Sequence, residues 1–133
     1  MKLNLVTLSV FIYGVFSNKL SDELMDDWNR IASVHAAACI EETDANPILA
    51  ESMFKDHKLI DEEHVKCYMK CLNEKNTFIF PNGTFNRDKF VNDIEHVTYA
   101  IIDKCLAKLN NDADLCKKSY SLAMCFSEEN YVA

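Results

Sequence analysis

The feature that most constrains this chain is its set of six cysteines, all of which follow residue 38: Cys39, Cys67, Cys71, Cys105, Cys116 and Cys125. An even number of cysteines in a short chain behind a secretory leader is typical of a disulfide-linked domain, here with three bonds. A zinc site would need closely paired ligands such as two CxxC motifs, which this sequence lacks. We therefore expect three cross-links, no bound metal and no cofactor.

The first 17 residues have the pattern of a signal peptide. Lys2 supplies a positive start, an apolar run follows from Leu3 to Phe16, and Val15-Phe16-Ser17 offers a cleavage site. The run is too short to span a bilayer comfortably, and a polar, acidic segment comes after it. The sequence thus predicts a signal peptide at 1–17 and one secreted, extracellular domain at 18–133.

The charge and glycine content of the predicted mature chain narrow its class further. Without Lys2, 13 Lys and Arg oppose 21 Asp and Glu, a net charge of −8, which argues against binding to nucleic acid or to anionic membrane surfaces. The mature chain has one glycine, Gly83, and so offers few of the tight turns that a β-rich fold needs. This composition predicts an all-α fold.

Apolar periodicity and capping residues predict six helices. Ser21 is the expected N-cap of the first, and the Asn46-Pro47 pair starts the second with proline in its first turn. The sequence leaves open whether the fourth and fifth helices are separate or fused near His96. The predicted helices cover about 20–40, a short segment from 46, a segment from about 61, 86–97, 98–109 and 112–126; 77–85 is a loop with a turn at 81–84.

Helical geometry limits how the cysteines can pair. Cys67 and Cys71 stand one turn apart on one predicted helix and project the same way, so we expect them to bond to other helices. Cys116 and Cys125 are nine residues apart, on opposite faces of the last helix at about 100° per residue. Excluding these two pairs leaves ten of the fifteen possible schemes open.

The spacing of the cysteines resembles that of the insect pheromone-binding and general odorant-binding proteins. The gaps are 27, 3, 33, 10 and 8 residues, and the gaps of 3 and 8 are the most specific. The resemblance covers the whole mature chain and includes the leader and the Phe-Pro-Asn-Gly loop, although the gap of 33 is short for that family. It implies the pairing Cys39–Cys71, Cys67–Cys116 and Cys105–Cys125.

The resemblance also implies a function. It predicts a compact six-helix, disulfide-linked domain around an apolar pocket, which carries small hydrophobic odorants or pheromones through aqueous lymph to a membrane odorant receptor, as a monomer or weak homodimer. The sequence has no catalytic motif, so we expect no enzyme. Two alternatives stay open: a non-olfactory carrier of lipids or other hydrophobic molecules on the same scaffold, and a structural or defensive disulfide protein without a pocket.

Nine apolar or aromatic residues on the predicted inner faces of helices are the candidates for the pocket, although helical spacing alone equally suits an ordinary core. Tyr99 is the candidate to offer a hydroxyl to the polar end of a ligand. The nine are Met53, Met69, Leu72, Phe90, Ile94, Tyr99, Ile102, Ala123 and Phe126.

Two features near the loop and the C-terminus allow a functional and an ordinary interpretation. Tyr131 and Val132 either fold over the pocket as a lid, with the terminal carboxylate held by a polar group, or belong to a disordered end. Asn82-Gly83-Thr84 is either an N-glycosylation site or simply a favoured turn.

Overall fold

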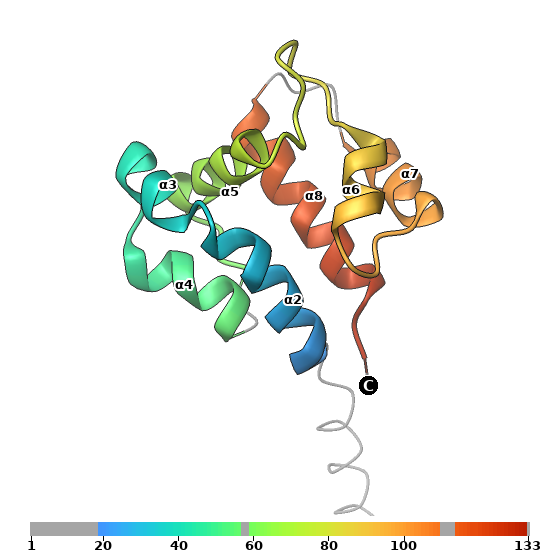
Figure 1. Cartoon of the computed structure of the whole chain (residues 1–133), viewed down its shortest axis with the longest axis horizontal. Coiled ribbons are helices and arrows are strands. Elements are labelled where there is room, and N and C mark those ends of the chain that lie inside the picture. Colours follow the sequence, from blue (N-terminus) through green and yellow to red (C-terminus); the bar gives the residue numbers. More distant parts are fainter. Residues whose placement is uncertain (1–18, 57–58, 110–113, 133) are drawn as a thin grey trace, which may run out of the picture.

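The computed structural model describes residues 19–56, 59–109 and 114–132, and in these ranges the chain forms seven helices and no strand. The predicted signal peptide lies outside them. In Figure 1, α8 crosses the middle of the molecule, with α2, α3 and α4 on one side and α6 and α7 on the other. The helices are α2 (Asp22–Ser33), α3 (Ala36–Thr43), α4 (Pro47–Lys55), α5 (Glu63–Lys75), α6 (Arg87–Asp93), α7 (Tyr99–Lys108) and α8 (Leu115–Glu129).

The prediction of an all-α, disulfide-linked domain is confirmed. Within the described ranges, every helix is too short or too polar to pass through a bilayer.

Helix starts follow the capping residues identified in the sequence. Ser21 Oγ accepts a hydrogen bond from the Leu24 amide at 3.2 Å, and Asn46 Oδ1 accepts one from the Ile48 amide at 2.9 Å. Each such cap stabilises its helix by about 1 kcal/mol, because it satisfies an amide that has no partner within the helix. The predicted N-cap Ser21 and the predicted helix start at Asn46-Pro47 are therefore confirmed, and Asn46 is in addition an N-cap.

The predicted helix over 20–40 is wrong as a single element, because the chain breaks it between α2 and α3. His35 leaves the helical region with φ −116° and ψ 7°, and the Ser33 hydroxyl donates to the carbonyl of Arg30. The cause is tertiary: α2 packs against α4, whereas α3 packs against α5, where Cys39 reaches Cys71. One straight helix could not serve both partners.

The segment between α6 and α7 separates these helices, which the sequence left undecided. Ile94 is extended and His96 has φ 65°, so the helical path ends there. The segment is held from two sides: Trp28 Nε1 donates to the carbonyl of Glu95 at 3.1 Å, and Asn130 Nδ2 donates to that of His96 at 3.2 Å. These bonds anchor the linker to α2 and to the end of α8.

The loop after α5 is a short hairpin with an antiparallel bridge between Ile79 and Phe85. The Gly83 amide donates to the carbonyl of Phe80 at 2.8 Å, so the turn closes one residue earlier than predicted. Gly83 has φ 89°, which favours glycine. Asn82 Oδ1 accepts from the amide and the hydroxyl of Thr84, at 3.0 and 2.7 Å, and so has the role in the turn that the sequence suggested; its glycosylation stays a prediction.

Three disulfides connect four of the helices. Cys39–Cys71 joins α3 to α5, Cys67–Cys116 joins α5 to α8, and Cys105–Cys125 joins α7 to α8, with Cα–Cα distances of 5.7, 4.5 and 5.7 Å. The pairing that the resemblance implied is confirmed. We refer to α3, α5, α7 and α8 as the cross-linked frame; α2, α4 and α6 carry no disulfide and are held by packing.

Candidate functional site

An apolar cavity of about 80 Å³, partly open to solvent, lies between the helices. Its wall is built by side chains of α2, α4, α5, α6 and α8 and of the segments that adjoin them. Leu, Ile, Met, Phe, Trp and Ala make up most of the wall, and none of the described residues that line it is ionisable. Such a space favours an uncharged, hydrophobic guest, because a charge moved there would lose its hydration without gaining a partner.

Seven of the nine predicted pocket residues line this cavity: Met53, Met69, Leu72, Phe90, Ile94, Ala123 and Phe126. They come from α4, α5, α8 and the α6 region, so the structure brings together residues up to 73 positions apart in the sequence. Their part in binding a ligand stays a prediction.

The structure places Tyr99 and Ile102 outside this wall. Tyr99 is 42% exposed at the start of α7, its hydroxyl donates to Asp88 at 3.0 Å, and its ring lies 4.2 Å from the guanidinium of Arg87. Ile102, on α7, is fully buried, but it packs in the core rather than against the cavity. Helical periodicity identified the buried position correctly but could not tell the cavity from the core around it.

One wall that the sequence did not nominate comes from α2 and the residues before it. Leu20, Met25, Trp28, Ile31 and Ala32 all line the cavity. The recurrence of apolar residues along this segment was visible in the sequence, and α2 is strongly amphipathic. That signal shows which face is buried but not that the face borders a cavity.

The two sides of the cavity differ in stiffness. Phe90 stacks on Phe78 with ring centroids 4.6 Å apart and meets the edge of Phe126 at 5.5 Å, so aromatic rings lock one another on this side. The other side includes Met53 and Met69, which belong to a different buried cluster and whose unbranched side chains adopt several shapes at little cost. The methionine side is therefore the one that can yield to a guest.

A second hollow of about 390 Å³ adjoins the cavity; we call it the outer hollow, because the exposed residues Lys19 and Tyr131 help to line it. The cavity and the outer hollow share Leu20, Met53, Leu59 and Ser127 as wall residues, so rotation of a few side chains would join them.

One of the two predicted lid residues, Tyr131, lies at this outer hollow. Tyr131 lines it, and the amide of Val132 donates to the carbonyl of Lys19 at 2.9 Å, which ties the C-terminal segment to the residues before α2. Ala133, whose carboxylate was expected to form a latch, lies outside the described residues. The placement of Tyr131 fits a lid, although lid function stays a prediction.

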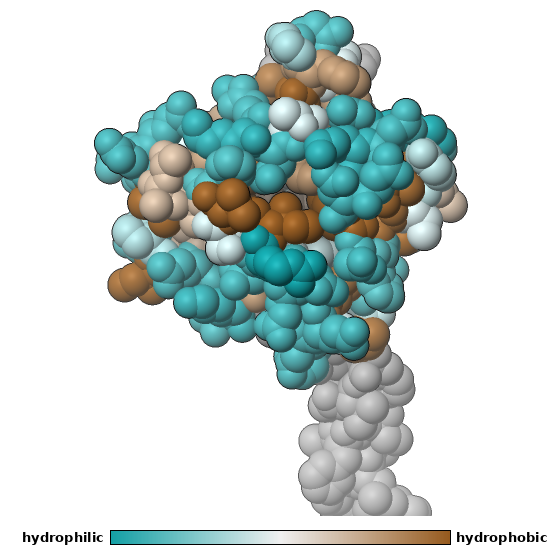
Figure 2. Space-filling view, viewed as in Figure 1, coloured by the Kyte–Doolittle hydropathy of each residue, from teal (hydrophilic) through white to brown (hydrophobic). Residues whose placement is uncertain are grey.

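Hydrophobic side chains gather on one face of the molecule. Figure 2 presents a hollow across the middle of this face, where hydrophobic surface lies between largely hydrophilic regions. In the same view of the ribbon, α2 and α5 lie on one side of that region and α6 on the other (Figure 1).

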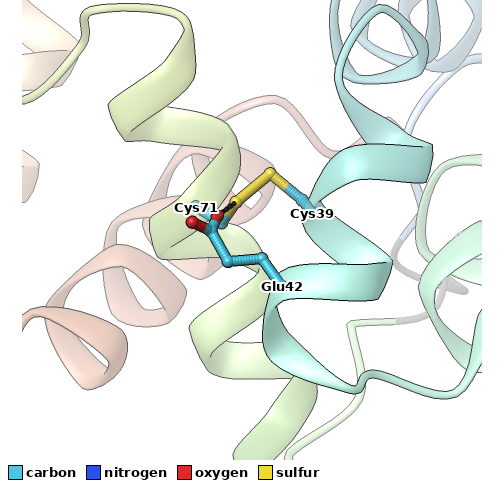
Figure 3. Close-up of side chains that lie close together, drawn as sticks. All are labelled: Cys39, Glu42 and Cys71. Atoms are coloured by element: carbon cyan, nitrogen blue, oxygen red, sulfur yellow. Dashed lines mark hydrogen bonds between the residues drawn. A yellow bond between two sulfur atoms is a disulfide. The ribbon is translucent and has the colours of Figure 1, made fainter.

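One group of potential metal ligands occurs in the described part of the chain: Cys39, Glu42 and Cys71 (Figure 3). The two sulfurs are bonded to each other, so neither offers a thiolate to a metal ion. A Glu42 carboxylate oxygen approaches Cys71 Sγ to 2.8 Å and lies 3.7 Å from Lys75 Nζ. With the disulfide formed, this cluster is a cross-link with an adjacent ion pair.

Charged groups with perturbed pKa values lie away from the cavity wall. The Arg87 guanidinium, 2.6 Å from Asp103, lowers the pKa of that carboxyl, and Lys104 lowers the pKa of Glu129 through a 2.9 Å contact. These pairs connect α6 to α7 and α7 to α8. The pKa of His64 is raised, mainly because its ring nitrogen Nδ1 is 2.9 Å from the carbonyl oxygen of Thr43.

A helical domain cross-linked by three disulfides, with an apolar cavity inside, defines a class of proteins that bind small hydrophobic molecules. Residues 21–129 match the model of the PBP/GOBP family, and the chain belongs to this family of pheromone-binding and general odorant-binding proteins. The family is one of binding and carrier proteins rather than enzymes, and its members are typically secreted. A search of curated proteins finds no match.

Proposed function

We propose that this protein is an extracellular carrier of small hydrophobic odorants or pheromones. It takes the ligand into the cavity and moves it through aqueous lymph to a membrane receptor, and no bond is made or broken. The observation that carries the proposal is the uncharged, apolar cavity inside a domain whose three disulfides sustain the fold around it. Each such cross-link stabilises a small secreted domain by about 2–5 kcal/mol, which offsets the packing energy that a void forfeits.

The size of the cavity sets how a ligand fits. A volume of about 80 Å³ is smaller than the roughly 150 Å³ that accommodates benzene in an engineered protein cavity. A ligand with a longer aliphatic chain therefore occupies both the cavity and the outer hollow of about 390 Å³, once the side chains of Met53 and Leu59 between them rotate. The ligand enters past Tyr131, which we propose as part of a lid together with Val132.

The expected affinity follows from the buried surface of the ligand. An aliphatic chain of about twelve carbons gains roughly 10 kcal/mol at about 0.8 kcal/mol per CH₂. Immobilising the ligand and ordering the methionine side remove several kcal/mol, so dissociation constants near micromolar are expected. Such values permit release as well as capture.

The test is displacement of the fluorescent apolar probe N-phenyl-1-naphthylamine by a panel of volatile compounds and lipids. A carrier of odorants binds the probe and releases it to selected volatiles at micromolar concentration. Displacement by lipids alone would identify a non-olfactory carrier. Absence of probe binding to the folded, oxidised protein would refute a carrier function altogether.

A further inference from the structure

Among the described residues, the wall of the cavity contains one fully buried hydroxyl with no hydrogen-bond partner. Ser119, in the first half of α8, is 1% exposed and lines the cavity, and its Oγ has no partner among the described residues. A serine inside a helix ordinarily bonds to the carbonyl four residues earlier, as Ser127 on the same helix does to Ala123 at 2.9 Å. A buried polar group left unsatisfied is costly, so its presence requires an explanation.

The other polar side chains in the described wall differ from Ser119 in how their hydrogen-bonding groups are satisfied. Ser127 is satisfied within α8, and Asn76 Nδ2 donates to the carbonyl of Leu72 at 2.8 Å. Asn73 lines the cavity too, but no polar atom of its side chain is both fully buried and without a partner. Ser119 Oγ is thus the fully buried side-chain atom of the described wall that could gain, from a guest, a hydrogen bond that the protein does not already make.

The charge of the wall restricts what this guest can be. No described residue of the inner cavity is cationic, so a carboxylate placed beside Ser119 would be buried without a counter-ion. Lys19 is cationic, but it lines the outer hollow rather than the inner cavity. A hydroxyl at Ser119 can both donate to and accept from a neutral oxygen.

From this geometry we infer that Ser119 selects ligands that consist of an apolar chain with a neutral oxygen at one end, such as an alcohol, aldehyde or ketone. Ser119 Oγ is fully buried in the structure, so the ligand oxygen reaches it once adjacent side chains shift, and the apolar part of the ligand extends past Met53 into the outer hollow. This inference rests on the proposed carrier function and gives the chemical class of its ligand. It also moves the polar contact from Tyr99, whose hydroxyl is engaged by Asp88, to α8.

The test compares decan-1-ol, decane and decanoate as competitors of N-phenyl-1-naphthylamine, with the full secreted protein and its Ser119→Ala variant. We expect the wild-type protein to prefer the alcohol over the alkane by about tenfold, the usual worth of one buried hydrogen bond. Ser119→Ala should abolish that preference and leave the affinity for decane unchanged or higher. Decanoate, whose charge can be accommodated only at the outer end, should respond little to the substitution.

The matched control is Ser121→Ala, which removes an exposed hydroxyl from the same helix and should keep the full preference for the alcohol. Circular dichroism melts of both variants check that they fold. Equal binding of decanol and decane by the wild-type protein, or a preference that persists in Ser119→Ala, would overturn the inference while the carrier function stands. Failure of the folded protein to bind the probe would refute both.

Discussion

Replacing Ala123 by phenylalanine tests directly whether the cavity is the ligand site. Ala123 lies on α8 and lines the cavity, so a larger side chain there occupies the space that a ligand would take. We take the part of a ligand that the new ring displaces from this 80 Å³ cavity to be about two or three CH₂ groups. A ligand that loses two or three buried CH₂ groups loses about 2 kcal/mol, or roughly thirtyfold in affinity.

The same substitution should leave the free energy of unfolding nearly unchanged. A void of 80 Å³ costs about 2 kcal/mol at roughly 24 cal/mol per Å³, and the phenyl ring recovers part of it. Forcing a ring into a packed site costs about 1–3 kcal/mol, so the two effects largely cancel. Weak binding in a protein of normal stability is therefore the expected signature of Ala123→Phe.

The assay is probe displacement by a volatile ligand, paired with urea unfolding followed by circular dichroism. Ala107→Phe, on the exposed face of α7, is the matched control and should change neither quantity. Ala123→Leu should give an intermediate loss of affinity. If both substitutions at Ala123 fold normally and bind as the wild-type protein does, and Phe90→Ala is also silent, the ligand does not occupy this cavity.

Three further outcomes follow from the structure. Deleting the chain from Tyr131 should weaken binding at neutral pH several-fold in the displacement assay; if that affinity survives the deletion, the tail is no lid. The pKa of His64 is raised in the folded state, so the protonated side chain stabilises the fold. This stabilisation is fully present below the pKa of histidine in the unfolded chain, and it is lost as the pH rises through the raised pKa of the folded state. His64→Gln should accordingly flatten the dependence of Tm on pH across the neutral range, and an unaltered slope would contradict this. Replacing both Cys105 and Cys125 by serine, which opens a link across 20 positions, should lower the free energy of unfolding by about 3 kcal/mol in urea titration; a loss below about 1 kcal/mol would show that packing alone holds α7 to α8.

Local chemistry explains why much of the fold was predictable. Ser21 and Asn46 act on amides within three residues of themselves, so their roles could be inferred without tertiary information. The disulfide pairing was different: geometry left ten schemes, and the family resemblance selected the one that the structure shows.

What the sequence missed depends on contacts between distant segments. The break at His35 arises because α2 and α3 pack on different helices, and no proline or glycine marks it. The missing partner of Ser119 Oγ is equally invisible in the sequence, since it depends on what surrounds the hydroxyl in three dimensions. Helical periodicity placed Ile102 inside correctly, but the border between cavity and core is set by packing.

The position of the disulfides has a consequence for how this scaffold can diverge. Two helices outside the cross-linked frame, α2 and α4, supply Met25, Trp28 and Met53 to the cavity wall. Substitutions in these helices can reshape the space for a guest without breaking a disulfide. They therefore cost only the packing energy of the replaced side chain. Descendants of one ancestral chain can then acquire different ligands through α2 and α4, while cysteine spacing is inherited almost unaltered.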